Sequence, residues 1–248
     1  MLLEVTHLDL WYGDNHVLKD VSFYVKSGEV LCIVGESGSG KSSILNAIMG
    51  LLPKHTRVYG SIKFKGKELI GLKEKGYRDI RGRYISIVFQ EPSSYLDPLF
   101  KVGPQIEETY IAHFGKKGAK ERAIRALKEA GVQDAQRVYS LYPHHLSGGL
   151  KQRVCISIAT VCDPDLILAD EPTTALDVPV QNKILDLFRN FRDKGKAIVL
   201  VTHDFGVVAE VADRVIVLKD GEILEEKDVF SIFDNPEHPY TLQLLRAL

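Results

Sequence analysis

One stretch of the sequence decides the fold: Gly35-Glu36-Ser37-Gly38-Ser39-Gly40-Lys41-Ser42-Ser43. An apolar run precedes it and a helix-like run follows it, which is the strand–loop–helix setting that the pattern G-x-x-x-x-G-K-[ST] requires. Its glycines allow backbone N–H groups to point at phosphate oxygens, and the positive end of the next helix points the same way. The Lys41 ammonium suits the β- and γ-phosphates, and the Ser42 hydroxyl suits Mg²⁺. The stretch therefore predicts a nucleoside triphosphate with magnesium, in preference to a plain Gly/Ser-rich turn.

The composition is that of a soluble globular protein. The 248 residues are 45% apolar and 26% charged, a length that fits one domain or one core with a subdomain. The 32 Lys and Arg against 33 Asp and Glu give a net charge of -1, which argues against a nucleic-acid footprint or an electrostatic membrane anchor. No apolar run approaches the roughly 18 residues that span a bilayer, and the N-terminus lacks a targeting pattern. We therefore expect a cytosolic chain whose membrane contacts pass through a protein partner.

The order of segments predicts a mixed α/β fold within a single domain, residues 1–248. Residues 1–90 predict a β subdomain followed by the start of the phosphate-loop core, in which residues 60–66, with a glycine at each end, are expected to form an exposed-edge strand. Residues from about 91 to 162 carry prolines and then an amphipathic helix that Gly131 ends, which predicts an inserted, mainly helical subdomain. Residues 163–233 return to the core, and residues 234–248 form a separate C-terminal segment.

Four polar residues come directly after predicted buried strands: Gln90, Asp170, Glu171 and His203. Strand ends beside a phosphate loop are where α/β sheets place their chemistry. Asp170 would suit the magnesium shell, and Glu171 would orient or deprotonate a water for attack on the γ-phosphate. Taken singly, each residue also has an ordinary structural explanation. Gln90 could be a surface amide, the acidic pair could form a helix N-cap, and His203 could be a structural histidine.

Two weaker signals also concern nucleotides. Ser147-Gly148-Gly149 opens a predicted helix, so its hydroxyl and backbone N–H groups could hold a second anion, although a plain capped helix start fits as well. Tyr12 lies at a turn where an adenine ring could stack on it, although a half-buried packing role is the alternative.

Taken together, these motifs show that the chain resembles the nucleotide-binding subunits of ABC transporters along essentially its full length. In the family's order they are Walker A at 35–43, the Q-loop at Gln90, the signature at 146–149, Walker B with its glutamate at 166–171, the D-loop at 175–177 and the switch histidine at His203. The resemblance implies a P-loop NTPase core of the ABC type with an N-terminal antiparallel β subdomain and an inserted helical subdomain. It also implies ATP and Mg²⁺ as cofactors.

The resemblance implies a role for each matched residue. It makes Glu171 and His203 catalytic. It assigns ATP contacts to Tyr12, Gly35, Glu36, Ser37, Gly38, Ser39, Gly40, Lys41, Ser42, Ser43 and Gln90. It assigns magnesium to Ser42, Gln90 and Asp170, and contacts with ATP on a second subunit to Ser147, Gly148, Gly149 and Asp177.

Finer features are similar to the D-type ATPase of dipeptide and oligopeptide importers, among them Asp170-Glu171-Pro172-Thr173-Thr174-Ala175-Leu176-Asp177-Val178 and Asn235-Pro236-Glu237-His238-Pro239-Tyr240-Thr241. Leu150 stands where the wider family usually has glutamine, a departure common in this branch. The branch implies a motor subunit paired head to tail with an identical or related ATPase, at the cytoplasmic face of the membrane. It would drive transmembrane permease subunits, one of which would contact residues 91–97, and would serve a solute-binding protein indirectly.

Several alternatives remain open from the sequence. Importers of nickel or oligosaccharides share the branch. Soluble ABC ATPases of translation or DNA repair typically carry two cassettes or a coiled-coil insert, which this sequence lacks, and Glu171 and His203 argue against a non-hydrolysing regulatory module. Members of the branch usually continue beyond the His-Pro-Tyr-Thr segment, some with a cysteine cluster, so a truncated chain and a short member both fit the end at Leu248.

Overall fold

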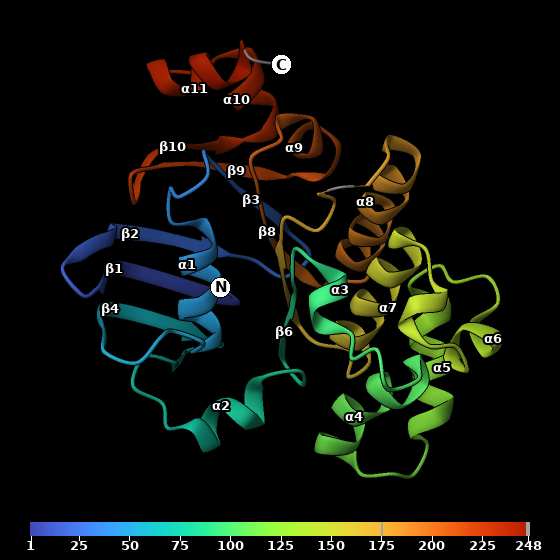
Figure 1. Ribbon diagram of the computed structural model, residues 1–248. Helices are drawn as coiled ribbons and strands as arrows, with labels where there is room; N and C mark the ends of the chain where they lie inside the picture. Colours follow the sequence, from blue (N-terminus) through green and yellow to red (C-terminus); the bar gives the residue numbers. More distant parts are fainter. Residues whose placement is uncertain (175, 247–248) are drawn as a thin grey trace. The chain divides into compact units, whose positions relative to one another are not determined.

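The computed structural model describes residues 1–174 and 176–246, which form two compact units (Figure 1). The phosphate-loop unit consists of Met1–Arg78 together with the chain from Phe188 onward, and the helical unit of Asp79–Leu187. Helices α2 (Glu74–Ile80) and α8 (Val178–Asp193) contain the points where the chain passes from one unit to the other.

The phosphate-loop unit contains an antiparallel sheet with the strand order β2-β1-β4-β5 and a second group of strands in the order β10-β9-β3-β8. The first sheet consists of β1 (Leu3–Tyr12), β2 (Asn15–Val25), β4 (Thr56–Phe64) and β5 (Lys67–Glu68). The second group consists of β3 (Val30–Val34), β8 (Ala197–Thr202), β9 (Arg214–Lys219) and β10 (Glu222–Asp228). Strand β3 is parallel to both β8 and β9, and every residue of β3 and β8 is buried, as is typical of central parallel strands.

The helices of this unit follow the strands that the sequence predicted. They are α1 (Lys41–Met49), α9 (Phe205–Val211), α10 (Val229–Asp234) and α11 (Pro239–Leu245). Strands β9 and β10 form a hairpin at Asp220-Gly221, whose φ angles of 49° and 83° match the turn that this dipeptide predicts.

Strand β4 differs from the expectation of an exposed-edge strand over residues 60–66. It begins at Thr56 and pairs with β1 along its length, and the two-residue β5 pairs with its end. Gly60 looked like a strand boundary in the sequence, but it lies inside the strand, opposite a register shift between Thr6 and Asp9 of β1. A glycine within a strand often marks such a bulge instead of an end.

The helical unit contains the parallel strands β6 (Ile85–Val88) and β7 (Leu166–Asp170) and a group of helices. These are α3 (Pro92–Tyr95), α4 (Val102–Phe114), α5 (Ala119–Glu129), α6 (Ala135–Tyr139), the 3₁₀ turn η1 (Pro143–His145) and α7 (Gly148–Thr160). The predicted amphipathic helix is α5, whose Ala123 and Leu127 are fully buried in the core of this unit.

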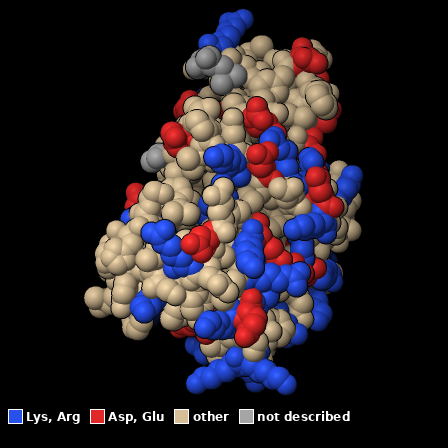
Figure 2. All heavy atoms as spheres, turned by 90° about the vertical axis from the view of Figure 1, so that its right-hand side faces the viewer, with Lys and Arg blue, Asp and Glu red and all other residues tan. Residues whose placement is uncertain are grey.

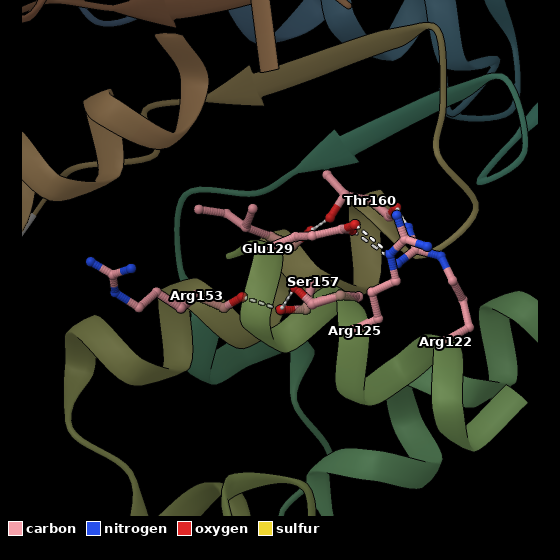
Figure 3. Close-up of polar contacts among 8 residues, drawn as sticks. Arg122, Arg125, Glu129, Arg153, Ser157 and Thr160 are labelled. Atoms are coloured by element: carbon pink, nitrogen blue, oxygen red, sulfur yellow. Dashed lines mark hydrogen bonds and ion pairs between the residues drawn. The ribbon is translucent and has the colours of Figure 1, made fainter. Parts of the chain in front are cut away.

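Polar contacts fix α7 against α5 (Figure 3). The Arg122 guanidinium donates to the Thr160 carbonyl at 3.1 Å and is paired with Glu129 at 2.9 Å. The Ser157 hydroxyl donates to the Arg153 carbonyl of its own helix at 2.7 Å and to the Ala126 carbonyl of α5 at 3.3 Å. Helix α7 therefore has a defined position, which matters because its first residues belong to the predicted signature.

The outer surface of α5 and the loop before it is rich in exposed basic residues, which are Lys116, Lys117, Lys120, Arg125 and Lys128. Figure 2 shows such side chains interspersed with acidic ones, as is usual for a solvated helix surface. Within residues 1–174 and 176–246, no helix combines the length and the apolar character needed to cross a membrane.

Candidate nucleotide-binding and hydrolysis site

The phosphate loop connects β3 to α1, and its backbone has the conformation that the sequence predicted. Gly38 and Gly40 have φ angles of 84° and 107°, in the left-handed region that glycine adopts at little cost. Next to Gly38 the space that a Cβ would occupy is open, which leaves room for a phosphate beside the loop backbone, here called the cradle. Helix α1 begins at Lys41 with Gly40 as its N-cap residue, which turns the first N–H groups of the helix toward this cradle.

Lys41 is the buried cation of the loop. Its side chain is folded over the loop, and its ammonium donates to the Gly35 and Glu36 carbonyls, both at 2.8 Å. The residue is only 6% exposed, so its charge lies in a region of reduced dielectric constant, where attraction to a phosphate is strong. The cradle and this cation together fit the triphosphate of a nucleotide.

Tyr12 ends β1 beside the phosphate loop. Its hydroxyl donates to the Ser43 hydroxyl at 3.2 Å, which brings the half-buried ring next to the first turn of α1. The neighbouring Trp11 ring is instead stacked on His16, with centroids 3.8 Å apart. Of these two aromatic residues, Tyr12 is therefore the one placed to stack on a base bound at the loop.

His203 leaves the adjacent strand at the same edge as the phosphate loop. Strands β3 and β8 are parallel, and Val34 is opposite Thr202, so Gly35 and His203 both follow the carboxyl ends of neighbouring strands. His203 is exposed, and the next residue, Asp204, caps α9 by accepting from the Gly206 amide at 2.7 Å. The backbone of His203 thus lies between a buried strand and a capped helix.

In the helical unit, Gln90, Asp170 and Glu171 gather at one edge. Strands β6 and β7 are parallel with Val88 opposite Ala169, so Asp170 ends one strand while Gln90 and Glu171 come just after the two strands. The Gln90 amide donates to the Glu171 carboxylate at 3.1 Å. An amide whose nitrogen is bound in this way presents its oxygen to a cation, and amide and carboxylate oxygens are ligands that Mg²⁺ prefers.

The backbone of Glu171 is unusual. Its φ angle is 41°, which is uncommon for a residue other than glycine and costs of order 1 kcal/mol. The Thr174 hydroxyl donates to the same carboxylate at 3.0 Å. Six other non-glycine residues also have a positive φ, so it is the hydrogen bonds from Gln90 and Thr174, and not the backbone angle, that position the Glu171 carboxylate.

The predicted signature residues form a hollow with the predicted D-loop. Ser147 is the N-cap residue of α7, but its hydroxyl makes no capping hydrogen bond, unlike the sequence-based expectation. A hollow of about 390 Å³ is lined by Ser147, Gly148, Gly149, Leu150, Arg153, Leu176, Asp177, Val180 and Lys183. It therefore unites all four residues predicted to act on a second subunit's ATP, while Ala175 of the same D-loop lies outside the described residues.

Sequence reasoning missed the two cations of this hollow. Arg153 follows Gly149 by four residues on α7, so helical spacing alone could have placed it on the same face. Lys183 comes from α8, and no local pattern connects it with the signature. With the Asp177 carboxylate they leave the lining with one net positive charge, and the Arg153 guanidinium donates to the Ala130 carbonyl at 2.7 Å.

The two signature glycines have different surroundings. A Cβ on Gly149 would lie 2.7 Å from the Val180 side chain, so α7 and α8 approach too closely there for a larger residue. A Cβ on Gly148 would meet nothing within 4 Å. The chain's own packing thus accounts for Gly149 but gives no reason for Gly148.

A model of the ABC transporter family matches residues 18–174. The chain belongs to the ABC transporter family. It is 47% identical over 232 residues to the oligopeptide transport ATP-binding protein OppD of Lactococcus lactis subsp. cremoris, a match that covers 92% of this chain and 69% of that protein. It is 44% identical over 255 residues to the dipeptide transport ATP-binding protein DppD of Haemophilus influenzae, a match that covers 100% of this chain and 77% of that protein. The match to OppD of Mycobacterium tuberculosis, at 45% identity, spans the whole chain but only 42% of that protein.

Solved structures confirm the predicted fold class, an ABC-type α/β core with an antiparallel β subdomain and a helical subdomain. A dimeric ATP-binding cassette in a post-hydrolysis state, bound to ADP and Pi, is 33% identical with a TM-score of 0.79, over 92% of this chain and 98% of that one. The cbiO1 protein of Clostridium perfringens, part of the ABC transporter complex cbiONQ, is 30% identical with a TM-score of 0.82, over 94% and 91%. This ABC family chain is an ATPase that binds ATP.

Proposed function

We propose that the chain is the ATP-hydrolysing motor subunit of an importer for dipeptides or oligopeptides. The observation that carries this proposal is the hollow at the start of α7 in the helical unit, which is lined by all the residues predicted to act on a second subunit. The similarity to peptide transport ATP-binding proteins at 42–47% identity supports the peptide class.

Each site residue has a role in this proposal. The loop from Gly35 to Ser43 binds the phosphates, and Tyr12 stacks on the adenine. Glu171 activates the attacking water, and His203 contacts the γ-phosphate. The Ser42 hydroxyl, the Gln90 amide oxygen and the Asp170 carboxylate are hard oxygen donors that fit Mg²⁺, which neutralises charge on the β- and γ-phosphates when bound.

Two such subunits, identical or related, pair head to tail in this proposal. The hollow of one subunit then completes the ATP site formed by the phosphate loop of the other. The pair acts at the cytoplasmic face of the membrane on transmembrane permease subunits, and a solute-binding protein delivers the peptide to them. An isolated chain consequently binds ATP but hydrolyses it slowly until it is paired.

The transported solute is tested with the chain in its native membrane complex. A tagged chain is purified with its permease subunits, reconstituted in liposomes with the solute-binding protein, and supplied with MgATP. Uptake and ATPase stimulation by a mixture of di- and oligopeptides are expected, and neither nickel nor oligosaccharides should stimulate. Stimulation by nickel or an oligosaccharide alone would assign the other solute of this branch, and absence of any permease subunit would favour a non-transport ATPase.

A further inference from the structure

The C-terminal segment Asn235–Thr241 lies in the same unit as the phosphate loop, yet no role in nucleotide chemistry has been attached to it so far. It comprises the link from α10 to α11 and the first three residues of α11, beyond the β9–β10 hairpin (Figure 1). Two contacts define its position, one with a buried carboxylate of β10 and one with the phosphate loop itself.

The first contact is an anchor formed by Glu225 of β10. This carboxylate accepts hydrogen bonds from the Glu237 amide at 2.8 Å, the His238 amide at 3.1 Å and the Thr241 hydroxyl at 2.6 Å. Lys227 lies 3.3 Å from it, and Glu225 itself is only 7% exposed. Burial alone would raise the pKa of Glu225, but these hydrogen bonds outweigh burial and lower the pKa to about 2. The anchor therefore holds the segment through an ionised side chain.

The second contact joins the segment to the phosphate loop. The Glu36 amide donates to the Tyr240 hydroxyl at 3.3 Å, and Tyr240 is only 4% exposed. The Lys219 ammonium lies 4.3 Å from the centroid of the Tyr240 ring, on the side of the β9–β10 hairpin. These contacts hold the ring of Tyr240 in place. Its phenol oxygen reaches Glu36, the second residue of the loop.

The hairpin supports the loop at another point. The Gly221 amide at the hairpin turn donates to the Ser39 carbonyl at 3.1 Å. Glu36 and Ser39 lie on either side of Gly38, the residue that borders the open cradle. These contacts restrain the loop on both sides of its cradle before a phosphate binds. The loop therefore loses less conformational entropy on binding, which favours a higher affinity.

We propose that Tyr240 is a positioning residue for the phosphate loop, and that the segment Asn235–Thr241, anchored on Glu225, sets the affinity of the loop for the triphosphate. This inference rests on the nucleotide site proposed above. It gives the His-Pro-Tyr-Thr motif a function in the ATPase unit itself, independent of any chain that follows it.

The test removes only the phenol oxygen. We expect Tyr240→Phe to raise the Kd for MgATP and the KM of the ATPase by about 3- to 10-fold, the effect of one hydrogen bond. The kcat at saturation should stay within about twofold, and the Tm without nucleotide should fall by no more than about 2 °C, because the buried ring remains. A merely structural role would instead lower the Tm and leave the KM unchanged.

A matched control is Tyr77→Phe, which removes another buried phenol hydrogen bond of the same unit, from Tyr77 to the Leu69 carbonyl at 2.9 Å. It should leave the Kd for MgATP unchanged. Thr241→Val loosens the anchor without touching the loop and should raise the Kd in the same direction as Tyr240→Phe, by a smaller factor. An unchanged Kd in Tyr240→Phe, or an equal rise in Tyr77→Phe, would overturn the inference, whereas failure of the wild-type chain to bind MgATP would overturn the proposed site instead.

Discussion

The phosphate loop and the start of α7 are both proposed to contact phosphate oxygens, but they differ in how many contacts the chain itself makes with them. Lys41 is buried against two loop carbonyls, and Tyr12 and Tyr240 contact the loop region from β1 and α11. At the start of α7, the Ser147 hydroxyl is exposed and makes no capping bond, and the space beside Gly148 is open.

In the proposed function, this difference corresponds to two different steps. A site restrained by its own chain can bind a ligand in an isolated subunit. A site whose donors and cations face an open hollow offers few contacts by itself, and becomes effective when a second surface brings the anion to it. The same comparison explains why Gly149, which packs on Val180, and Gly148, which packs on nothing, occur side by side.

The largest effect is expected when the chemical step is removed but both anion sites stay intact. Glu171→Gln keeps the hydrogen-bonding shape of the side chain and removes the base, so turnover should fall by about 10²- to 10⁴-fold while MgATP still binds. Size-exclusion chromatography with MgATP should then show a stable dimer. Glu108→Gln, an exposed change on α4, serves as control, and a monomer with full turnover would contradict the assignment of the base.

The next effect concerns the self-contained site. Lys41→Ala removes a buried cation, so the affinity for MgATP should fall by about 100-fold, as expected for charge-assisted contacts with phosphate. The measurement is a calorimetric titration of the isolated chain, compared with the exposed variant Lys54→Ala. Equal affinities in the two variants would mean that the loop is not the primary phosphate site.

The sequence predicted the phosphate loop better than the hollow at the start of α7, for a physical reason. The strand, the glycines, Lys41 and the helix start are contiguous, and their local periodicity and backbone requirements are visible in the chain. The grouping of Gln90 with Glu171 also followed, because polar residues after parallel strands meet at one edge.

Features that depend on packing between distant segments were not predictable. Lys183 joins Ser147 in one hollow only because α8 packs beside α7, and nothing near Lys183 in the sequence signals this. The pairing of Glu225 with Thr241 likewise connects a strand with a later helix, and a single carboxylate in β10 has no distinctive local pattern. The role of Gly60 was predicted wrongly because glycine is typical both of strand ends and of bulges within strands.

An intermediate effect is expected at the open site. Gly148→Ala should fold normally, because its Cβ meets no neighbouring atom, yet its turnover should fall by about 10- to 100-fold if a second subunit's phosphates approach there. Gly149→Ala should lower both turnover and Tm, because its Cβ would press on Val180, and the double variant with Val180→Ala should regain Tm. Full turnover in Gly148→Ala would contradict the role of the hollow.

The smallest effect on turnover comes from the anchor behind the phosphate loop, whose ionised carboxylate also stabilises the fold. The pKa of Glu225 is about 2 in the folded chain against an ordinary value of 4.5, so its ionised form stabilises the fold above pH 4.5 and this contribution disappears as the pH falls toward 2. Each tenfold change in a protonation equilibrium corresponds to about 1.4 kcal/mol, so the full contribution is about 3 kcal/mol.

Urea unfolding followed by the fluorescence of Trp11, the single tryptophan, should therefore show Glu225→Gln less stable than the wild type at pH 6, with the difference shrinking toward pH 2. Glu222→Gln, an exposed change on the same strand, serves as the control and should not show this dependence on pH. If the stability difference for Glu225→Gln does not depend on pH, the ionised anchor does not stabilise the phosphate-loop unit.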